Sequence, residues 1–242
     1  MASKVLIYGG SGGIGSATAR ILHARGLQLH LVGRNQESLV ALADELGASY
    51  TVGDVLDSAL FPRVAAETGE SLDGLVYAVG TLNLRSLPRL NEADFLNDFR
   101  VNALGAALAV QAALPALKNS AGTASVVLYS SIAAQQGFAL HASLGMAKGA
   151  IKGLTLSLAA ELAPKVRVNA IAPSLTRTPL AAGILANEQT AQTIAGIHPL
   201  PRIGTPADMA ALTAFLLSTD ADWMTGQIIG VDGGRSTLRV KG

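Results

Sequence analysis

The chain has 242 residues, of which 50% are hydrophobic and 14% are charged, and its 18 Lys and Arg against 17 Asp and Glu leave a formal charge of +1. A disordered chain would have lower hydrophobicity and higher net charge, and a nucleic-acid-binding protein would have a basic surplus, so both classes are excluded. Because the chain contains no cysteine, disulfides, thiolate nucleophiles and thiolate zinc sites are excluded as well.

Short apolar runs alternate with longer segments of helical period along the chain. The predicted strands are 4–8, 28–33, 49–53, 74–80, 124–130, 166–172 and 227–232. The predicted helices are 14–25, 36–46, 59–68, 92–117, 143–162 and 206–218. Apolar strands separated by helices are typical of a parallel sheet that is covered on both faces. We therefore expect a single α/β domain over residues 1–242, with a Rossmann-type, doubly wound, parallel seven-stranded sheet.

Two segments need separate interpretation. The longest apolar stretch, 101–117, contains Asn102, Gln111 and Pro115 and is shorter than the roughly 20 apolar residues of a membrane span. The N-terminus reaches Gly9 after too few apolar residues for a signal peptide. We therefore expect a cytoplasmic protein without membrane or nucleic-acid partners.

The segment 179–205 interrupts the alternation of strands and helices with several prolines and glycines. No strand or helix is predicted in it, and we expect it to form a mobile flap over the ligand. Its apolar residues include Leu180, Ile184, Leu185, Ile194 and Ile197. An apolar flap favours a small hydrophobic substrate.

A glycine-rich turn, YGGSGGIG at residues 8–15, follows the first predicted strand and starts the first predicted helix. Gly10, Gly12 and Gly15 fit the pattern G-x-G-x-x-G. Glycine allows φ angles that side chains forbid and lets the backbone approach a pyrophosphate, whose charge is stabilised by a helix N-terminus. We predict a dinucleotide site here, although a turn required only for tight packing has the same pattern. The predicted contacts are Gly9, Ser11, Gly13, Ile14 and Gly15.

The end of the second predicted strand indicates which dinucleotide binds. NAD sites usually have a carboxylate at this position for the ribose hydroxyls, but this chain has Gly33 followed by Arg34. A guanidinium group suits the 2′-phosphate of NADP; the alternative is a solvated arginine that leads into a helix. We predict NADP(H) as the cofactor, with NAD as the less favoured one.

Further segments of the chain resemble the short-chain dehydrogenase/reductase family over essentially its whole length. They are GDV (53–55), RVNALGA (100–106), VRVNAIAPSLTRT (166–178) and PRIGTPADMAALTAFLLSTDADWMTGQIIGVDGG (201–234). The resemblance implies cofactor contacts at Asp54, Val55, Val79, Gly80, Lys148, Ile171, Pro173 and Thr178. It also implies that Asn102 is a catalytic asparagine and that the protein forms a homotetramer or homodimer.

The catalytic signature departs from the ordinary family pattern. That pattern has a tyrosine four residues before a lysine and a serine thirteen residues before the tyrosine. Lys148 and Ser131 match it, but Leu144 stands at the tyrosine position. Leucine has no proton to donate, so the chain resembles an atypical member that lacks the catalytic tyrosine.

A second alignment resembles the divergent enoyl-reductase branch of the family, whose tyrosine stands seven residues before the lysine. His141 occupies that position, and YAVG (77–80) also favours this relationship. Seven residues make two helical turns, so His141 and Lys148 share one helix face. Imidazole titrates much closer to neutral pH than phenol does, which suits a proton donor.

We therefore predict that His141 donates the proton, Ser131 polarises the carbonyl, Lys148 binds the cofactor ribose and Asn102 supports a water. Other donors stay open: Ser131 or Ser143 with a water relayed by Lys148, or a displaced Tyr77 or Tyr129. No metal site is predicted, because His23, His30 and His198 have no partners at ligand spacing.

These residues predict an NADP(H)-dependent oxidoreductase that transfers hydride to or from a carbonyl or enone-type carbon of a small hydrophobic substrate. Two alternatives remain. One is a dinucleotide-binding sensor or scaffold without redox activity, which the leucine at position 144 favours. The other is an enoyl-thioester reductase.

Overall fold

Seven strands form one sheet in the computed structural model, which describes residues 3–239, and every neighbouring pair of strands runs parallel. The strands are β1 (Lys4–Tyr8), β2 (Gln28–Gly33), β3 (Ser49–Val52), β4 (Gly74–Tyr77), β5 (Ala124–Tyr129), β6 (Val166–Pro173) and β7 (Ile228–Val231). Their order is β3-β2-β1-β4-β5-β6-β7. The order reverses between β1 and β4, and the carboxyl ends of strands at such a point form the crevice in which these folds bind ligands. The predicted fold class is confirmed.

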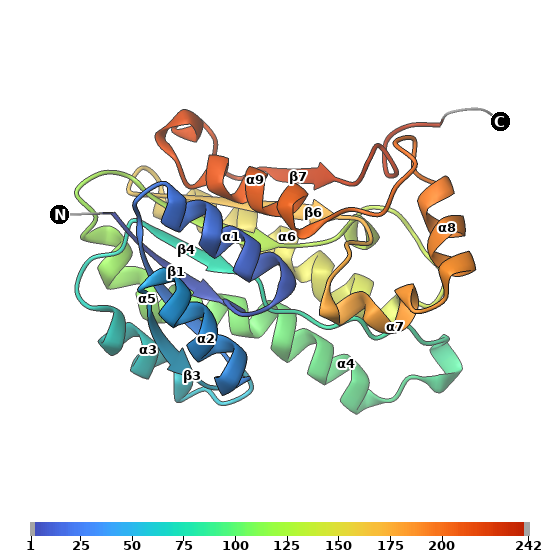
Figure 1. Ribbon diagram of the computed structural model, residues 1–242, viewed down its shortest axis with the longest axis horizontal. Coiled ribbons are helices and arrows are strands. Elements are labelled where there is room, and N and C mark those ends of the chain that lie inside the picture. Colours follow the sequence, from blue (N-terminus) through green and yellow to red (C-terminus); the bar gives the residue numbers. More distant parts are fainter. Residues whose placement is uncertain (1–2, 240–242) are drawn as a thin grey trace.

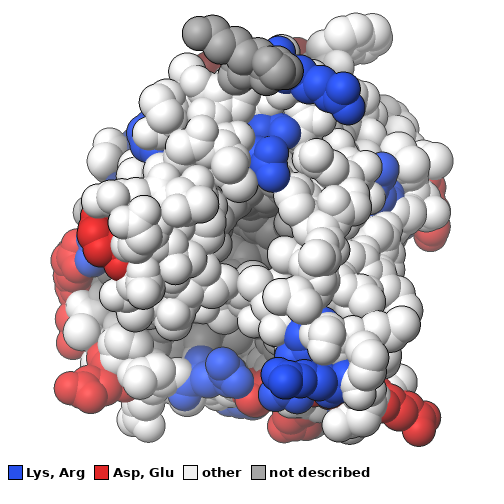
Figure 2. All heavy atoms as spheres, turned by 90° about the vertical axis from the view of Figure 1, so that its right-hand side faces the viewer, with Lys and Arg blue, Asp and Glu red and all other residues white. Residues whose placement is uncertain are grey.

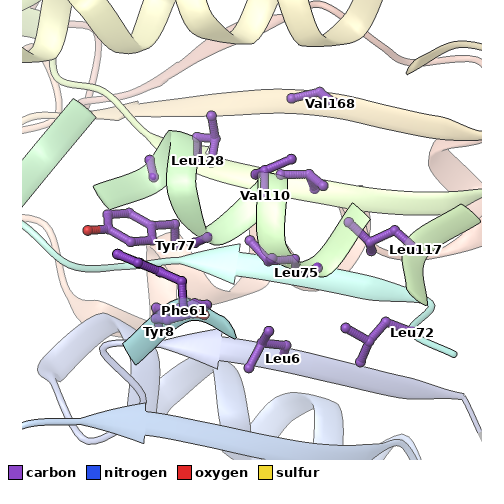
Figure 3. Packing of buried hydrophobic residues seen from close by; sticks show 14 of the residues in the cluster. Leu6, Tyr8, Phe61, Leu72, Leu75, Tyr77, Val110, Leu117, Leu128 and Val168 are labelled. Carbon is purple, nitrogen blue, oxygen red and sulfur yellow. The ribbon is translucent and has the colours of Figure 1, made fainter. Parts of the chain in front are cut away.

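Helices cover both faces of the sheet (Figure 1). They are α1 (Gly13–Ala24), α2 (Gln36–Leu46), α3 (Leu60–Thr68), α4 (Glu92–Phe99), α5 (Gly105–Lys118), α6 (Ala142–Leu162), α7 (Ala182–Leu185), α8 (Glu188–Gly196) and α9 (Pro206–Leu216). Buried residues of α1, α2 and α9 pack on one face, and those of α3, α5 and α6 pack on the other. In Figure 3, Leu75 and Leu128 of neighbouring strands lie against Val110 of α5. Each such buried side chain contributes about 1.5–3 kcal/mol of hydrophobic stabilisation.

Local sequence sets where several helices begin. Thr205 caps α9 and Asn91 caps α4, and each accepts a backbone hydrogen bond from an aspartate three residues later. The aspartate side chain accepts a bond from the capping residue's own N–H in return, so two backbone donors are satisfied at each helix start.

The predicted helix 92–117 is wrong in one respect, because a wide π turn, η2 (Arg100–Leu104), separates α4 from α5. The hydroxyl of Tyr77, at the end of β4, donates a 2.6 Å hydrogen bond to the carbonyl of Val101 inside this turn. A Cβ on Gly105 would collide with the same hydroxyl. A side chain from another element therefore widens the helix, and such turns occur frequently at functional sites.

Among the described residues, the helical run Glu92–Lys118, which comprises α4, η2 and α5, is the one with the length and composition to cross a membrane. Half of its most apolar window is buried inside the fold, where α5 packs on the sheet.

The segment 179–205 contains helices that the sequence analysis did not predict: η4 (Pro179–Ala181), α7 and α8. The side chain of Asn187 caps α8 by accepting a hydrogen bond from the N–H of Thr190 at 2.9 Å. Figure 1 shows α7 and α8 at the end of the molecule toward which the strands point. The segment therefore lies where the flap was predicted, but as short helices.

Candidate active site

A cavity of about 340 Å³ opens at the carboxyl ends of the strands, and Figure 2 shows the hollow in this face of the molecule. Eight of the predicted site residues line it: Ile14, Val79, Gly80, Ser131, His141, Lys148, Pro173 and Thr178. Apolar flap residues, among them Leu180, Ile184, Ile194 and Ile197, complete the wall. The fold therefore brings the predicted catalytic residues Ser131, His141 and Lys148 to one cavity.

The glycine turn before α1 is packed so tightly that two of its residues leave no space for a side chain. Gly9 has a φ of +76°, and a Cβ on it would lie 2.7 Å from the carbonyl oxygen of Ala78. A Cβ on Gly15 would collide with the carbonyl oxygen of Gly9. Within the described residues, no side chain caps α1, so the first N–H groups of this helix are available to an anion.

Arg34 and Asp54 lie at the ends of the neighbouring strands β2 and β3. Their side chains are exposed, and the guanidinium Nη1 lies 3.5 Å from the carboxylate Oδ2. The Asp54 carboxylate also accepts a 2.9 Å bond from the N–H of Leu56, which fixes its position. The N–H groups of Gly9 and Gly10 donate to the backbone oxygen of Val32, so Arg34 follows β2 beside the glycine turn, with its side chain exposed to water.

Lys148 is buried on α6, and its Nζ donates a 2.8 Å hydrogen bond to the backbone oxygen of Tyr129 at the end of β5. Burial lowers the pKa of Lys148 to about 8, and the nearby charge of Asp98 opposes that shift. A Cβ on Gly80 would lie 3.3 Å from Nζ and 3.0 Å from Oδ1 of Asn102. The absence of a side chain at Gly80 therefore keeps the space beside the ammonium group open.

Asn102 is buried in the π turn η2 and does not line the cavity. Its amide nitrogen donates to the backbone oxygen of Asp98 at 2.7 Å and to Oγ1 of Thr81 at 2.8 Å. Its oxygen accepts a long, 3.4 Å bond from the N–H of Thr81. Both amide donors are thus used inside the protein, and only the oxygen has capacity left for a water.

Ser131 follows β5 and caps the short helix η3 (Ile132–Ala134) by accepting a 3.1 Å bond from the N–H of Ala133. This bond uses one lone pair and leaves the hydroxyl hydrogen free to be donated into the cavity. The neighbouring Ser130 is instead buried and donates to the backbone oxygen of Lys148 at 2.9 Å.

His141 immediately precedes α6, and its Nδ1 lies 2.7 Å from the backbone oxygen of Ala139. A carbonyl oxygen can only accept, so Nδ1 carries a hydrogen and Nε2 of the neutral ring carries none. The preceding Leu140 has a φ of +68°, which is costly for a bulky residue and shows that the surrounding loop imposes this conformation. Leu144 is 3% exposed and also lines the cavity.

The hydroxyl groups of the other candidate donors bond elsewhere. Ser143 is buried and donates to the Asp98 carboxylate at 2.6 Å. Tyr77 bonds Val101, and Tyr129 pairs with Oγ1 of Thr213 at 2.6 Å. Burial raises the pKa of both tyrosines, which makes their hydroxyls poorer acids.

Sequence reasoning did not assign His198, Ser174, Arg235 or Phe138 to the site, and all four line the cavity. Nδ1 of His198 donates to the backbone oxygen of Ile194 at 2.7 Å, so its Nε2 accepts the Ser174 hydroxyl at 2.8 Å. The guanidinium carbon of Arg235 lies 5.6 Å from the Phe138 ring centroid, whose distance to the His141 ring is 5.4 Å. The pairs Ser174–His198 and Arg235–Phe138 join segments far apart in the sequence, and no local pattern could have shown them. Within residues 3–239, no three His, Cys, Asp or Glu side chains lie close enough to hold a metal ion.

Comparisons with known proteins agree with this geometry. Residues 9–236 match the sequence model of the family described as Enoyl-(Acyl carrier protein) reductase. The chain is 34% identical to Carbonyl reductase family member 4 of Danio rerio, over 98% of this chain and 100% of that protein. It is 35% identical to Cis-4-hydroxycyclohexanecarboxylate dehydrogenase of Sinomonas cyclohexanicum, over 96% of each. The solved structure of ElxO with NADP bound superimposes with a TM-score of 0.90 at 28% identity, over 98% of this chain and 100% of that one.

Proposed function

Because the chain belongs to the short-chain dehydrogenase/reductase family of oxidoreductases, we propose that it reduces the carbonyl group of a small hydrophobic substrate with NADPH. The observation that carries this proposal is the cavity shared by Ser131, His141 and Lys148. Most of the remaining wall is apolar, which suits a carbonyl compound with a hydrophobic body.

The residues present fit a dinucleotide. The turn before α1 is so tight that a Cβ at Gly9 or Gly15 would collide with neighbouring backbone atoms, and the uncapped first turn of α1 suits a pyrophosphate. The exposed guanidinium of Arg34 supports a preference for NADPH, because it can bind a 2′-phosphate with two parallel hydrogen bonds. The structure of ElxO with NADP bound is consistent with that preference.

A bound nicotinamide supplies the hydride, and the chain's own residues hold the substrate oxygen and provide its proton. Ser131 donates its free hydroxyl hydrogen to that oxygen and stabilises the negative charge that develops on it. His141 protonates the oxygen from Nε2. Lys148, held by the Tyr129 carbonyl, binds a ribose hydroxyl, and Asn102 holds a water beside it.

The hydrogen bond from His141 to Ala139 determines which form of the ring can donate. Neutral His141 has no hydrogen on Nε2, so only the imidazolium form donates to the substrate oxygen. Lys148 gives the reaction a pH dependence, because its ammonium group loses its charge near pH 8. Reduction therefore slows as pH rises through about 8.

The test is NADPH oxidation with a panel of ketones and quinones, measured between pH 5 and 9 for the wild type and His141→Phe. We expect the variant to lose about 100-fold in kcat, as for a general acid. His23→Phe, on the exposed side of α1, serves as the control and should behave as wild type. Unchanged kcat in His141→Phe would refute the proton donor but not the reductase.

Two observations favour alternative functions. The leucine at position 144 favours a dinucleotide sensor or scaffold without redox activity; NADPH binding without turnover of any compound in the panel would support it. His141, seven residues before Lys148, and the description of the matching family both favour an enoyl-thioester reductase. Faster turnover of crotonyl thioesters than of ketones would support that function.

We also propose that the protein is a homotetramer or homodimer. Leu96 and Phe99 of α4 and Leu104 of the π turn are exposed by 52%, 39% and 40%, and such a patch suits an interface. Light scattering after size-exclusion chromatography measures the oligomeric state directly.

A further inference from the structure

One side chain of the cavity wall has no role in the proposed reaction. Arg235 follows the last strand, β7, and lines the cavity together with Phe138 and His141. Its guanidinium group lies over the Phe138 ring. Within residues 3–239 this group forms no ion pair and donates no hydrogen bond, whereas Arg20, Arg85 and Arg202 are each paired with a carboxylate. Arg235 therefore has its planar set of donors available to a ligand.

No acidic side chain among the described residues of the cavity wall neutralises the charge of Arg235 either. Lys148 and Arg235 are cationic, and none of the described residues that line the cavity is an aspartate or glutamate. Figure 2 shows basic side chains above and below the hollow and uncharged residues on its walls. A cavity with low-dielectric walls and charge of one sign concentrates ligands of the opposite sign.

The position of Arg235 in the cavity indicates which anionic group it binds. In the proposed complex, the glycine turn and Arg34 bind the phosphates of the cofactor. Arg235 instead contacts Phe138, whose ring also contacts His141, the proposed proton donor. An anionic group bound at Arg235 therefore belongs to the molecule whose oxygen receives that proton.

We propose that the substrate is a small keto acid whose carboxylate is bound by Arg235. This inference rests on the proposed carbonyl reduction. A guanidinium group matches the two oxygens of a carboxylate. The cavity of about 340 Å³ is near the lower limit for ligand sites, and it must also hold the nicotinamide, since Pro173 and Thr178 line it. The remaining space suits one ring or a short chain between ketone and carboxylate, not a long acyl thioester.

The experiment compares acids with their neutral amides. The probes are 4-oxocyclohexanecarboxylate, 4-oxopentanoate and their carboxamides, titrated into the NADPH-loaded protein while the fluorescence of bound NADPH is followed. We expect each acid to bind about 10- to 100-fold more tightly than its amide, as for a charge-assisted hydrogen-bonded pair. Arg235→Gln should abolish this difference without changing the affinity for the amides. Arg239→Gln, an exposed arginine four residues later, is the matched control.

Equal binding of acid and amide by the wild type would overturn the inference, as would an acid preference that survives Arg235→Gln. Tighter binding of acetoacetyl-coenzyme A than of either keto acid would also overturn it, because the anion would then be a phosphate of a carrier arm. Turnover of the same compounds keeps the two proposals distinct. If the acids bind more tightly than the amides but no compound is turned over, only the proposed reductase activity is refuted. If neutral ketones are turned over but the acids bind no more tightly than the amides, only the carboxylate site is refuted.

Discussion

Between β1 and α1, the candidate site is a tight glycine turn in which backbone atoms pack against each other, whereas around η3, the start of α6 and the flap the cavity wall consists of side chains. The first region depends on missing side chains at Gly9 and Gly15, and a single added methyl group collides with a carbonyl oxygen. In the second region, Ser174 and Arg235 reach across from distant parts of the chain. A site built from backbone atoms tolerates few amino-acid substitutions and keeps its ligand. A site built from side chains can gain a different substrate when those side chains are substituted. The following predictions test this difference, from the largest expected effect to the smallest.

Gly15→Ala should weaken NADPH binding at least 100-fold, because the new Cβ displaces the carbonyl of Gly9 and distorts the turn. Fluorescence titration measures the Kd, and far-UV circular dichroism checks the fold. Gly153→Ala adds the same methyl group in the interior of α6, where nothing lies within 4 Å, and should leave binding unchanged. An unaltered Kd for Gly15→Ala would show that the cofactor does not rest on this turn.

Arg34→Leu should weaken NADPH binding by about 10- to 100-fold and leave NADH binding unchanged, because only NADPH carries a 2′-phosphate. The loss should shrink at high salt, since Arg34 is exposed. The ratio of the two Kd values is the measurement, and Arg89→Leu, another exposed arginine, is the control. Equal losses for both dinucleotides would place Arg34 outside the phosphate site.

Lys148 should make stability depend on pH. Its pKa is about 8 in the folded protein against 10.5 in an unfolded chain, so between these values the unfolded state binds more protons. The stability of the wild type relative to Lys148→Met should therefore rise by about 2 kcal/mol from pH 7 to 9.5. Urea unfolding at both pH values measures it. Lys152→Met, one turn later, should show no such trend; a flat difference for Lys148→Met would mean that its ammonium is not desolvated.

Ser174→Ala should cost about 1 kcal/mol of stability, because Nε2 of the buried His198 loses its donor. His198 belongs to the flap segment and Ser174 follows β6, so the KM for a ketone should also rise about threefold while kcat changes less. Steady-state kinetics and urea unfolding check both effects. Ser71→Ala, at an exposed surface bond, is the control. An unchanged KM would show that this contact does not position the flap.

The difference between the backbone region and the side-chain region of the site also explains how much could be predicted from the sequence. The strands and the glycine turn have local signals, namely apolar runs and glycine spacing, and the structure places them close to the predicted ranges. The largest difference among the strands is that the one predicted over 74–80 ends at Tyr77. The spacing predicted that His141 and Lys148 share one helix face, but His141 lies just before α6 and not in it. Both nevertheless line one cavity with Ser131, and the roles of the three residues remain predictions. The contacts of Arg235 depend on where distant segments meet, which no local pattern encodes. The helix α8 was missed although Asn187 and Glu188 at its start are a helix-initiating pair.

The π turn η2 connects the hydrophobic core directly to the candidate site. Tyr77 is wholly buried among hydrophobic side chains, yet its single phenolic oxygen sets the pitch of the backbone that presents Asn102. Exchanging that tyrosine for phenylalanine alters one atom in the interior, at a distance from any ligand. The substitution would nevertheless displace the side-chain amide of Asn102, so a change that the core tolerates still alters the candidate site.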